Sequence, residues 1–408
     1  MLKKLWIQNF KAIRDLTIEF TPFTVLIGEN SSGKSTVLQA LDFLRSIASQ
    51  DIDEYLKDRE WDFADIKSQG VSAKARKVPI RFVADFVIED IPLTWDISVN
   101  HGDGKWDIQE SVYDTTSGAY YLYLGPKRPS ETLYDFSQFG LKSSALKLLD
   151  VEKNVPQGTK FDKVLQKLKS WLASSNSFEL LSPDKMRSRS IRGRGQAKDI
   201  GMGGERLAAY LLLKTSPLGR TVLSERREIE RMVSDFIGHD VRITATAIAP
   251  GLDQIYLEES WNTRKTKVNK HHISDGLLRV IALSTILASQ GDGKRKDHAP
   301  LGFITLDEIE DGINPDLSEK FMASFKRMAV ETNRQVVITT HSPVMVNFVD
   351  ESDIQFMWRD RSGTVHVKPL FQTKEMKETL DFLGPGEVWM NYGKESIVER
   401  LSAAGENA

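Results

Sequence analysis

The chain of 408 residues is 40% hydrophobic and 27% charged, which is the composition of a globular protein with roughly two or three domains. It contains no cysteine, which excludes disulfides, thiolate zinc sites and cysteine nucleophiles and fits the cytoplasm, where we expect the protein. Its net charge of −2 excludes a protein that is basic overall, and the lack of a long apolar run leads us to expect no membrane partner.

The first part of the chain predicts strands, a phosphate loop and a helix. Residues 4–10 and 16–20 alternate in polarity as a half-buried antiparallel pair does, and 23–27 is a short buried strand that runs into a glycine. Residues 34–48 have helical spacing. From Ile80 to Tyr123, short alternating runs predict an antiparallel sheet.

The middle of the chain predicts helices, at 161–172, 205–214 and 228–237. Between the first two, residues 186–204 are rich in Gly, Arg and Ser and predict an exposed loop. Strands return from about Val241, and no sustained heptad pattern supports a long coiled coil.

The motif "GENSSGKS", Gly28 to Ser35, matches a phosphate loop and lies between a buried strand and a helix, where such a loop has to lie. Gly28 and Gly33 permit the bend that points backbone amides at phosphates, Lys34 would reach the β- and γ-phosphates, and Ser35 would bind Mg²⁺. The alternative is a chance glycine-rich turn, which both flanks disfavour. The candidate nucleotide-binding residues are Gly28, Glu29, Asn30, Ser31, Ser32, Gly33, Lys34, Ser35 and Thr36.

Two further motifs follow buried strands. Residues 303–306 end in Asp307, a candidate to hold the water shell of Mg²⁺, and in Glu308, a candidate to polarise the water that attacks the γ-phosphate. His341 follows the strand at 335–340 and is placed to sense the γ-phosphate or hold that water. Taken alone, the acids are a solvated strand end and the histidine is structural; beside a phosphate loop, the catalytic interpretation is favoured.

A second candidate anion site lies at Ser274, Asp275 and Gly276, which open an apolar helix. Ser274 suits the N-cap position, and the first amide hydrogens of a helix have no partner within it. The alternative is that Ser274 only caps a core helix. The residues alone do not say why the chain would carry two phosphate-binding positions.

Taken together, the phosphate loop, "SDG", "ITLDE" and "THSP" occur in the order of ATP-binding-cassette ATPases. The chain resembles the branch with SMC proteins, RecF-like proteins and OLD-family nucleases, and more closely its compact AAA-15/AAA-21 ATPases, many of them linked to antiphage defence. The resemblance implies an α/β ABC-type P-loop head with a mixed sheet and helices, built from residues 1–124 and 239–408. Residues 125–238 would form a mainly helical insertion.

The resemblance also implies that ATP is sandwiched between two copies. Ser274 and Gly276 would then donate to the γ-phosphate held by the partner's phosphate loop, which explains the second anion site and predicts a homodimer or a higher even oligomer. The implied activity is ATP hydrolysis with ATP and Mg²⁺. Three positions depart from the family pattern: Asp275 replaces a glycine, Asn314 stands where relatives often have histidine, and the coupling glutamine has only Gln69 as a candidate.

The biological role stays open between two alternatives. The ATPase acts on DNA in repair or defence, or it is a nucleotide-gated scaffold that holds and releases a separately encoded toxin or nuclease. A stand-alone nuclease ranks third, since the acidic segment 307–316, "DEIEDGINPD", is better explained as part of the ATP site. DNA contacts would come from two basic clusters, Arg187, Arg189, Arg192, Arg194 and Lys198 in one and Arg264, Lys265, Lys267 and Lys270 in the other. The alternative for such a cluster is a solvated loop or a surface that binds an acidic partner.

Overall fold

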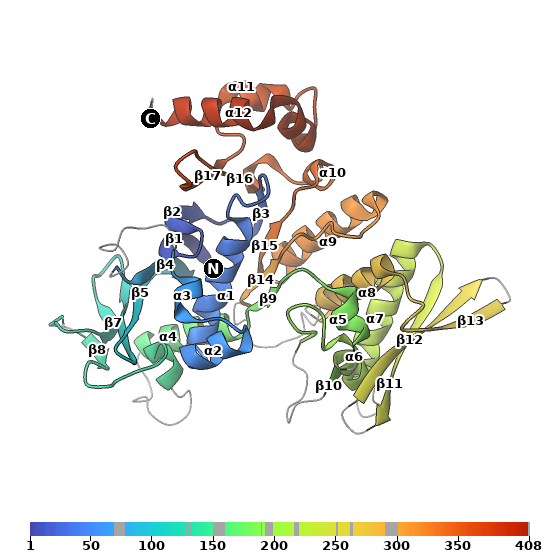
Figure 1. The fold of residues 1–408 in the computed structure, drawn as a ribbon, viewed down its shortest axis with the longest axis horizontal. Helices are drawn as coiled ribbons and strands as arrows, with labels where there is room; N and C mark the ends of the chain where they lie inside the picture. Colours follow the sequence, from blue (N-terminus) through green and yellow to red (C-terminus); the bar gives the residue numbers. More distant parts are fainter. Residues whose placement is uncertain are drawn as a thin grey trace.

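The computed structural model contains three sheets and the helices that cover them (Figure 1). It describes residues 1–68, 78–127, 129–130, 132–149, 160–188, 190–191, 199–215, 220–249, 252–261, 264–289 and 301–406. None of the described helices is both long and apolar enough to cross a bilayer.

The central sheet joins segments from both ends of the chain in the order β17-β16-β3-β15-β14-β9. Its strands are β3 (Phe23–Ile27), β9 (Asn176–Phe178), β14 (Phe303–Leu306), β15 (Gln335–Thr339), β16 (Ile354–Arg359) and β17 (Val365–Pro369). All neighbours pair in parallel except β16 and β17. The carboxyl ends of β3, β9, β14 and β15 therefore meet at one edge, where parallel sheets bind ligands.

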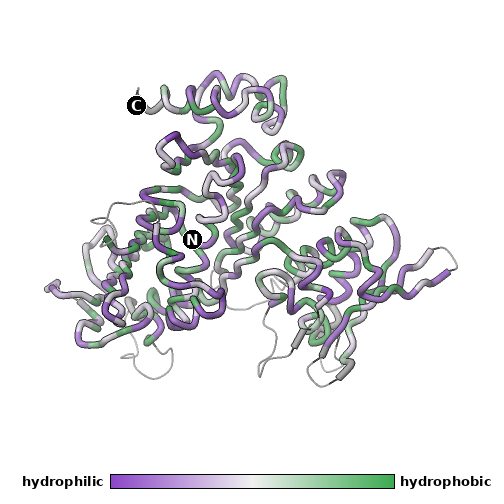
Figure 2. Tube along the Cα trace, viewed as in Figure 1, coloured by the Kyte–Doolittle hydropathy of each residue, from purple (hydrophilic) through white to green (hydrophobic). Residues whose placement is uncertain are grey.

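Both faces of the central sheet are buried. Figure 2 shows the hydrophobic colouring along its strands. Successive side chains of a strand point to opposite faces, so Val25 and Ile27 of β3 enter one apolar core and Leu26 enters the other. Helices α8 (Asp275–Ala288) and α9 (Ser318–Glu331) belong to the first core, and α1 (Lys34–Ile47) belongs to the second.

The N-terminal sheet has the order β2-β1-β4-β5-β6-β7-β8. Its strands are β1 (Leu2–Phe10), β2 (Ile13–Glu19), β4 (Ile80–Ile88), β5 (Ile91–Gly102), β6 (Lys105–Asp114), β7 (Tyr120–Leu124) and β8 (Thr132–Asp135). The predicted antiparallel pair at the N-terminus and the predicted antiparallel sheet after Ile80 are both confirmed. This region also has helices α2 (Ile52–Asp58), α3 (Phe63–Ile66), η2 (Ala145–Leu148) and α4 (Lys160–Ala173).

A second lobe carries the third sheet, β10 (Ser190–Ile191), β11 (Asp240–Ala249), β12 (Leu252–Trp261) and β13 (Arg264–Asn269). Its helices are α5 (Pro183–Arg187), α6 (Leu207–Thr215) and α7 (Arg220–Ile237), beside α8. The helices predicted in the middle of the chain are confirmed as α4, α6 and α7. The predicted exposed loop at 186–204 is wrong in part, because Met186 and Ile200 are buried in the core.

The remaining elements follow β14 and complete the head. They are η3 (Pro315–Leu317), α10 (Pro343–Val346), η4 (Glu351–Asp353), α11 (Lys374–Thr379) and α12 (Pro385–Glu406), with a kink in α12 at Gly393. Within 125–238, β8 extends the N-terminal sheet and β9 forms an edge of the central sheet, so those residues combine strands with helices. The predicted boundaries between head and insertion stay a prediction.

Candidate functional site

The phosphate loop connects β3 to α1 through two glycines in unusual backbone conformations. Gly28 has a φ of 144° and Gly33 a φ of 103°, which residues with a side chain rarely adopt. A Cβ at position 28 would also lie only 2.1 Å from the carbonyl oxygen of Met357 in β16. The loop therefore approaches the backbone of β16 closely. It leads directly into the amino end of α1, where free amide hydrogens favour anions.

Lys34 folds back into this loop. Its Nζ donates to the carbonyl oxygens of Gly28 and Glu29, at 2.8 and 2.9 Å, and the residue is buried. Burial lowers the pKa of Lys34, and the nearby carboxylates of Asp307 and Glu308 oppose that effect. The loop thus holds a buried ammonium group beside the carboxyl end of β14.

Asp307 is the centre of a row of oxygen atoms. The hydroxyls of Ser35 and Thr339 both donate to Asp307 Oδ1, at 3.2 and 2.5 Å, and the backbone N–H of Glu308 donates to the Thr339 hydroxyl at 2.8 Å. Burial raises the pKa of Asp307, while the two hydroxyl hydrogen bonds work against the rise. A carboxylate and a serine hydroxyl so placed are suitable oxygen ligands for Mg²⁺.

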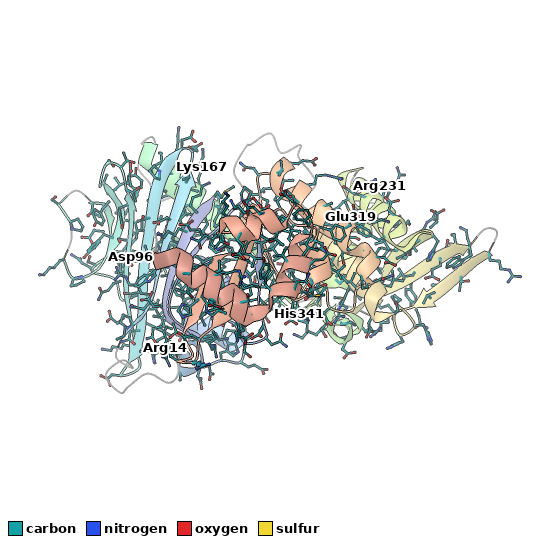
Figure 3. The ribbon with its side chains drawn as sticks, turned by 90° about the horizontal axis from the view of Figure 1, so that it is seen from above. Arg14, Asp96, Lys167, Arg231, Glu319 and His341 are labelled. Atoms are coloured by element: carbon teal, nitrogen blue, oxygen red, sulfur yellow. The ribbon has the colours of Figure 1, made fainter. Side chains whose placement is uncertain are left out.

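Glu308 and His341 face each other across the same edge. Glu308 has a φ of 48°, a strained conformation for a residue with a side chain, and its Oε1 lies 4.0 Å from His341 Nδ1. A nearer carboxylate is Glu310, whose Oε1 lies 3.0 Å from the same nitrogen. Seen from above the C-terminal helices, His341 lies at a flank of the molecule between its two outer sheets (Figure 3).

Ser274 and Gly276 lie in the second lobe, and no hydrogen bond or ion pair between described residues joins them to the phosphate loop. Ser274 is exposed and caps α8 by accepting from Leu277 N at 3.3 Å. Gly276 packs against the segment after Glu308, because a Cβ there would lie 2.7 Å from the carbonyl oxygen of Gly312. The predicted site residues thus form two groups in one chain.

Asp275 is turned toward Arg187. The Arg187 guanidinium pairs with the Asp275 carboxylate and donates to the Ile273 carbonyl oxygen at 2.7 Å. The carboxylate that replaces the family glycine is therefore neutralised by a neighbouring cation at the start of α8. Arg187 is thus tied to α8, which the sequence prediction of a DNA-binding arginine in a loop did not foresee.

The basic clusters are only partly described. Arg189, Arg192, Arg194 and Lys198 lie outside the described residues, as does Gln69. Arg264, Lys265 and Lys267 are exposed on β13, but Lys270 is buried and its Nζ donates to the Arg187 carbonyl oxygen at 2.7 Å. Lys270 therefore does not belong to the exposed cluster. Asn314 caps η3 by accepting from Asp316 N at 3.2 Å.

Sequence reasoning missed Thr339, Glu310 and the ion pair between Glu29 and Lys394. Lys394 Nζ, just after the kink in α12, lies 2.7 Å from Glu29 Oε2 in the phosphate loop. Thr339 carried one signal, a hydroxyl at the end of a buried strand beside the histidine motif. Nothing local in the sequence relates Lys394 to a residue near the N-terminus.

A family model described as "AAA domain, putative AbiEii toxin, Type IV TA system" matches residues 142–347, about half of the chain. The chain belongs to this AAA family. A second model, described as an AAA ATPase domain, matches residues 1–170 of the AAA protein. The two models together take in the phosphate loop, the acids of β14 and the histidine that follows β15.

Known proteins similar to the chain include a nuclease and two SMC heads. A stretch of 44 residues is 39% identical to the OLD nuclease of Thermus scotoductus, but it covers 11% of this chain and 8% of that protein. The SMC head bound to the C-terminal winged-helix domain of ScpA is similar with a TM-score of 0.55 and 17% identity over 92% of this chain and 99% of the SMC head.

An SMC head with an extended coiled coil, bound to a ScpA domain from Pyrococcus furiosus, has a TM-score of 0.53 and 15% identity over 93% of this chain and 98% of that one. At such identities the likeness shows the fold alone. It confirms the predicted ABC-type P-loop head. The family models identify the AAA protein as an AAA-type ATPase.

Proposed function

We propose that this AAA protein hydrolyses ATP with Mg²⁺ at the carboxyl edge of the central sheet. The observation that carries the proposal is the hydrogen-bonded row of Ser35, Asp307 and Thr339 beside Lys34. Lys34 would bind the β- and γ-phosphates, and Ser35 and Asp307 would hold Mg²⁺. When bound, Mg²⁺ neutralises the charge that develops between those phosphates.

Glu308 is the proposed base for the attacking water, and His341 holds that water or senses the γ-phosphate. His341 Nδ1 lies 4.0 Å from Glu308 Oε1, and this distance supports a role for both side chains on one water molecule beyond the strand ends. The amides of the phosphate loop, from Glu29 through Thr36, would bind the remaining phosphate oxygens. Catalysis would then rest on positioning and electrostatics, as in other phosphoryl transfers.

We propose further that the complete site forms between two copies. Among the described residues, no hydrogen bond or ion pair joins Ser274 or Gly276 to the phosphate loop of their own chain, which supports a role for them on the partner's nucleotide. The pairing of Asp275 with Arg187 removes the charge repulsion that the carboxylate would otherwise exert on a phosphate. A homodimer, or an assembly of dimers, would be the active form.

Mixing two defective variants tests both proposals. Lys34→Ala should abolish nucleotide binding or hydrolysis, and Ser274→Ala should abolish hydrolysis while leaving its own phosphate loop intact. A one-to-one mixture should regain about a quarter of the wild-type rate, because half the dimers contain one complete site. Lys34→Ala mixed with Glu308→Gln is the control and should stay inactive, since both defects then lie in the same half-site.

No recovery from co-expressed subunits would contradict the shared site, and full activity of Lys34→Ala would contradict the ATPase site itself. Glu308→Gln provides a second measurement, since it should hydrolyse poorly yet accumulate an ATP-bound dimer on size-exclusion chromatography. Normal turnover of Glu308→Gln would mean that another group is the base.

DNA is the proposed partner of the hairpin formed by β12 and β13, which projects from the second lobe in Figure 1. Arg264, Lys265 and Lys267 are exposed on it, although Lys265 also pairs with Glu258 at 3.1 Å. Such cations would contact phosphates without reading sequence, in repair or in antiphage defence.

Reversing the three hairpin charges to glutamate should weaken DNA binding and DNA-stimulated hydrolysis and flatten the dependence of binding on salt. Lys374→Glu on α11 is a matched control, because Lys374 is exposed and lies on a different element. Unchanged DNA binding in the triple variant would exclude the hairpin as the contact.

The alternative is a cytoplasmic nucleotide-gated scaffold that holds a separately encoded toxin or nuclease. The family description, which names a toxin and a Type IV TA system, supports this alternative. It predicts slow hydrolysis, no stimulation by DNA, and co-purification of a neighbour-encoded protein with Glu308→Gln. Release of that protein by the wild-type ATPase on ATP addition would favour the scaffold over a role on DNA.

A further inference from the structure

The imidazole of His341 has a specific partner that the proposed site does not use. Glu310 Oε1 lies 3.0 Å from His341 Nδ1 and also accepts from the backbone N–H of His341 at 2.7 Å. Glu308 is the other carboxylate that faces this nitrogen, at 4.0 Å. One oxygen atom of Glu310 thus accepts from the backbone N–H of His341 and lies close to its ring nitrogen.

Glu310 is held in place by the segment around it. Its neighbour Asp311 pairs with Arg279 of α8 at 2.5 Å, and Asp311 N donates to the Glu308 carbonyl oxygen at 3.1 Å. The Glu310 side chain is only 13% exposed, and its Oε2 is buried with no hydrogen-bond partner among the described residues. A buried oxygen without a partner costs free energy, so packing alone does not explain a carboxylate here.

A histidine that donates from one ring nitrogen to a carboxylate has a fixed tautomer and orientation. With the Nδ1 proton on the Glu310 side, Nε2 of the neutral ring has a lone pair and can only accept a hydrogen bond. Such a nitrogen can hold a water molecule by one of its protons. It cannot donate to a phosphate oxygen unless the ring is charged.

We propose that Glu310 is the positioning residue that keeps His341 in the Nδ1–H form, so that Nε2 accepts a proton of the attacking water. The inference rests on the proposed ATPase site and deepens it, because it chooses between the two roles left open for His341. Glu310 itself touches neither nucleotide nor water in this arrangement. It acts through the ring that it orients.

The experiment combines histidine-selective ¹⁵N NMR with ATPase kinetics. The His341 signals are assigned by their loss in His341→Asn. The wild type should show a protonated Nδ1 and an unprotonated Nε2 at pH 8. Glu310→Gln keeps an acceptor oxygen and should retain that spectrum, whereas Glu310→Ala should move the proton to Nε2. Glu319→Ala is the matched control, an exposed carboxylate on α9 that Figure 3 labels together with His341.

Glu310→Ala should lower kcat roughly 10- to 100-fold, with little change in ATP affinity. This is the range known for removal of carboxylates that orient metal-ligating histidines, which are held in the same way. Glu310→Gln should recover part of the rate. An unchanged His341 tautomer in a folded Glu310→Ala protein would overturn the proposal. If Glu310→Ala also lowered kcat while the spectrum stayed that of the wild type, the role of Glu310 would be purely structural. Wild-type kcat in His341→Asn would instead refute the proposed function of His341, and the spectra would still test Glu310.

Discussion

Thr339→Val tests the row of oxygen atoms that centres on Asp307. Valine has the shape of threonine, and position 339 is fully buried in β15, so the substitution removes a hydroxyl and little else. That hydroxyl donates to Asp307 Oδ1 and accepts from the backbone N–H of Glu308, at 2.5 and 2.8 Å. Both acids of the proposed site therefore lose a contact at once.

The expected cost follows from these two bonds. A hydrogen bond to a charged group contributes about 1.5–3 kcal/mol and a neutral one about 1 kcal/mol, with part of each recovered by relaxation. A loss of about 1.4–2.8 kcal/mol in the positioning of Asp307 and Glu308 raises the activation free energy by that amount, and kcat then decreases roughly 10- to 100-fold. The Mg²⁺ concentration at half-maximal rate should rise as well, because Asp307 is less firmly oriented.

The assay is ATP hydrolysis at a series of Mg²⁺ concentrations, with thermal unfolding as a check on the fold. Thr339→Ser keeps the hydroxyl and should stay within a few-fold of the wild-type rate. A folded Thr339→Val protein with the wild-type rate and the same Mg²⁺ dependence would refute the reasoning, and Asp307 would then not depend on Thr339.

Three further predictions concern the phosphate loop and the N-terminal sheet. Gly28→Ala should abolish ATP binding in a binding titration or prevent folding, because its Cβ would lie 2.1 Å from the Met357 carbonyl oxygen; normal binding would contradict this geometry. Burial raises the pKa of Glu110 from 4.5 to about 7. Between these two pH values Glu110 is protonated in the native state and ionised in the unfolded state, so the free energy of unfolding falls as pH rises through this range. Urea unfolding of Glu110→Gln should lack this decrease, and an unchanged slope would mean that another group causes it. Lys394→Ala and Glu29→Ala should each weaken ATP binding, and the double variant should bind ATP no more weakly than the weaker-binding single variant. If the losses of binding free energy simply add, the two residues do not act through their ion pair.

The local part of the site was predictable from the sequence. The strand, glycine turn and helix around Lys34 are adjacent along the chain, and the requirement for glycine at positions 28 and 33 is a property of the turn itself. The antiparallel strands at the N-terminus were predictable because alternation of polar and apolar residues is a local pattern.

The contacts between distant strands were not predictable in this way. Thr339 reaches Asp307 because β14 and β15 pair in parallel with Leu306 opposite Ile338, and a shift of one residue would turn the hydroxyl to the other face. Glu310 reaches His341 through the same pairing. Lys270 lies in a basic run of the sequence, but its burial depends on α5, which packs near it only in the folded chain.

The central position of β3 has a consequence for synthesis of the protein. The strand that leads into the phosphate loop leaves the ribosome early, yet both of its neighbours, β15 and β16, are translated roughly 300 residues later. At about 5–20 residues per second, β3 waits on the order of 15–60 s with both edges unpaired. The nascent chain should therefore need chaperones during that interval, and it cannot capture ATP productively until its last strands emerge.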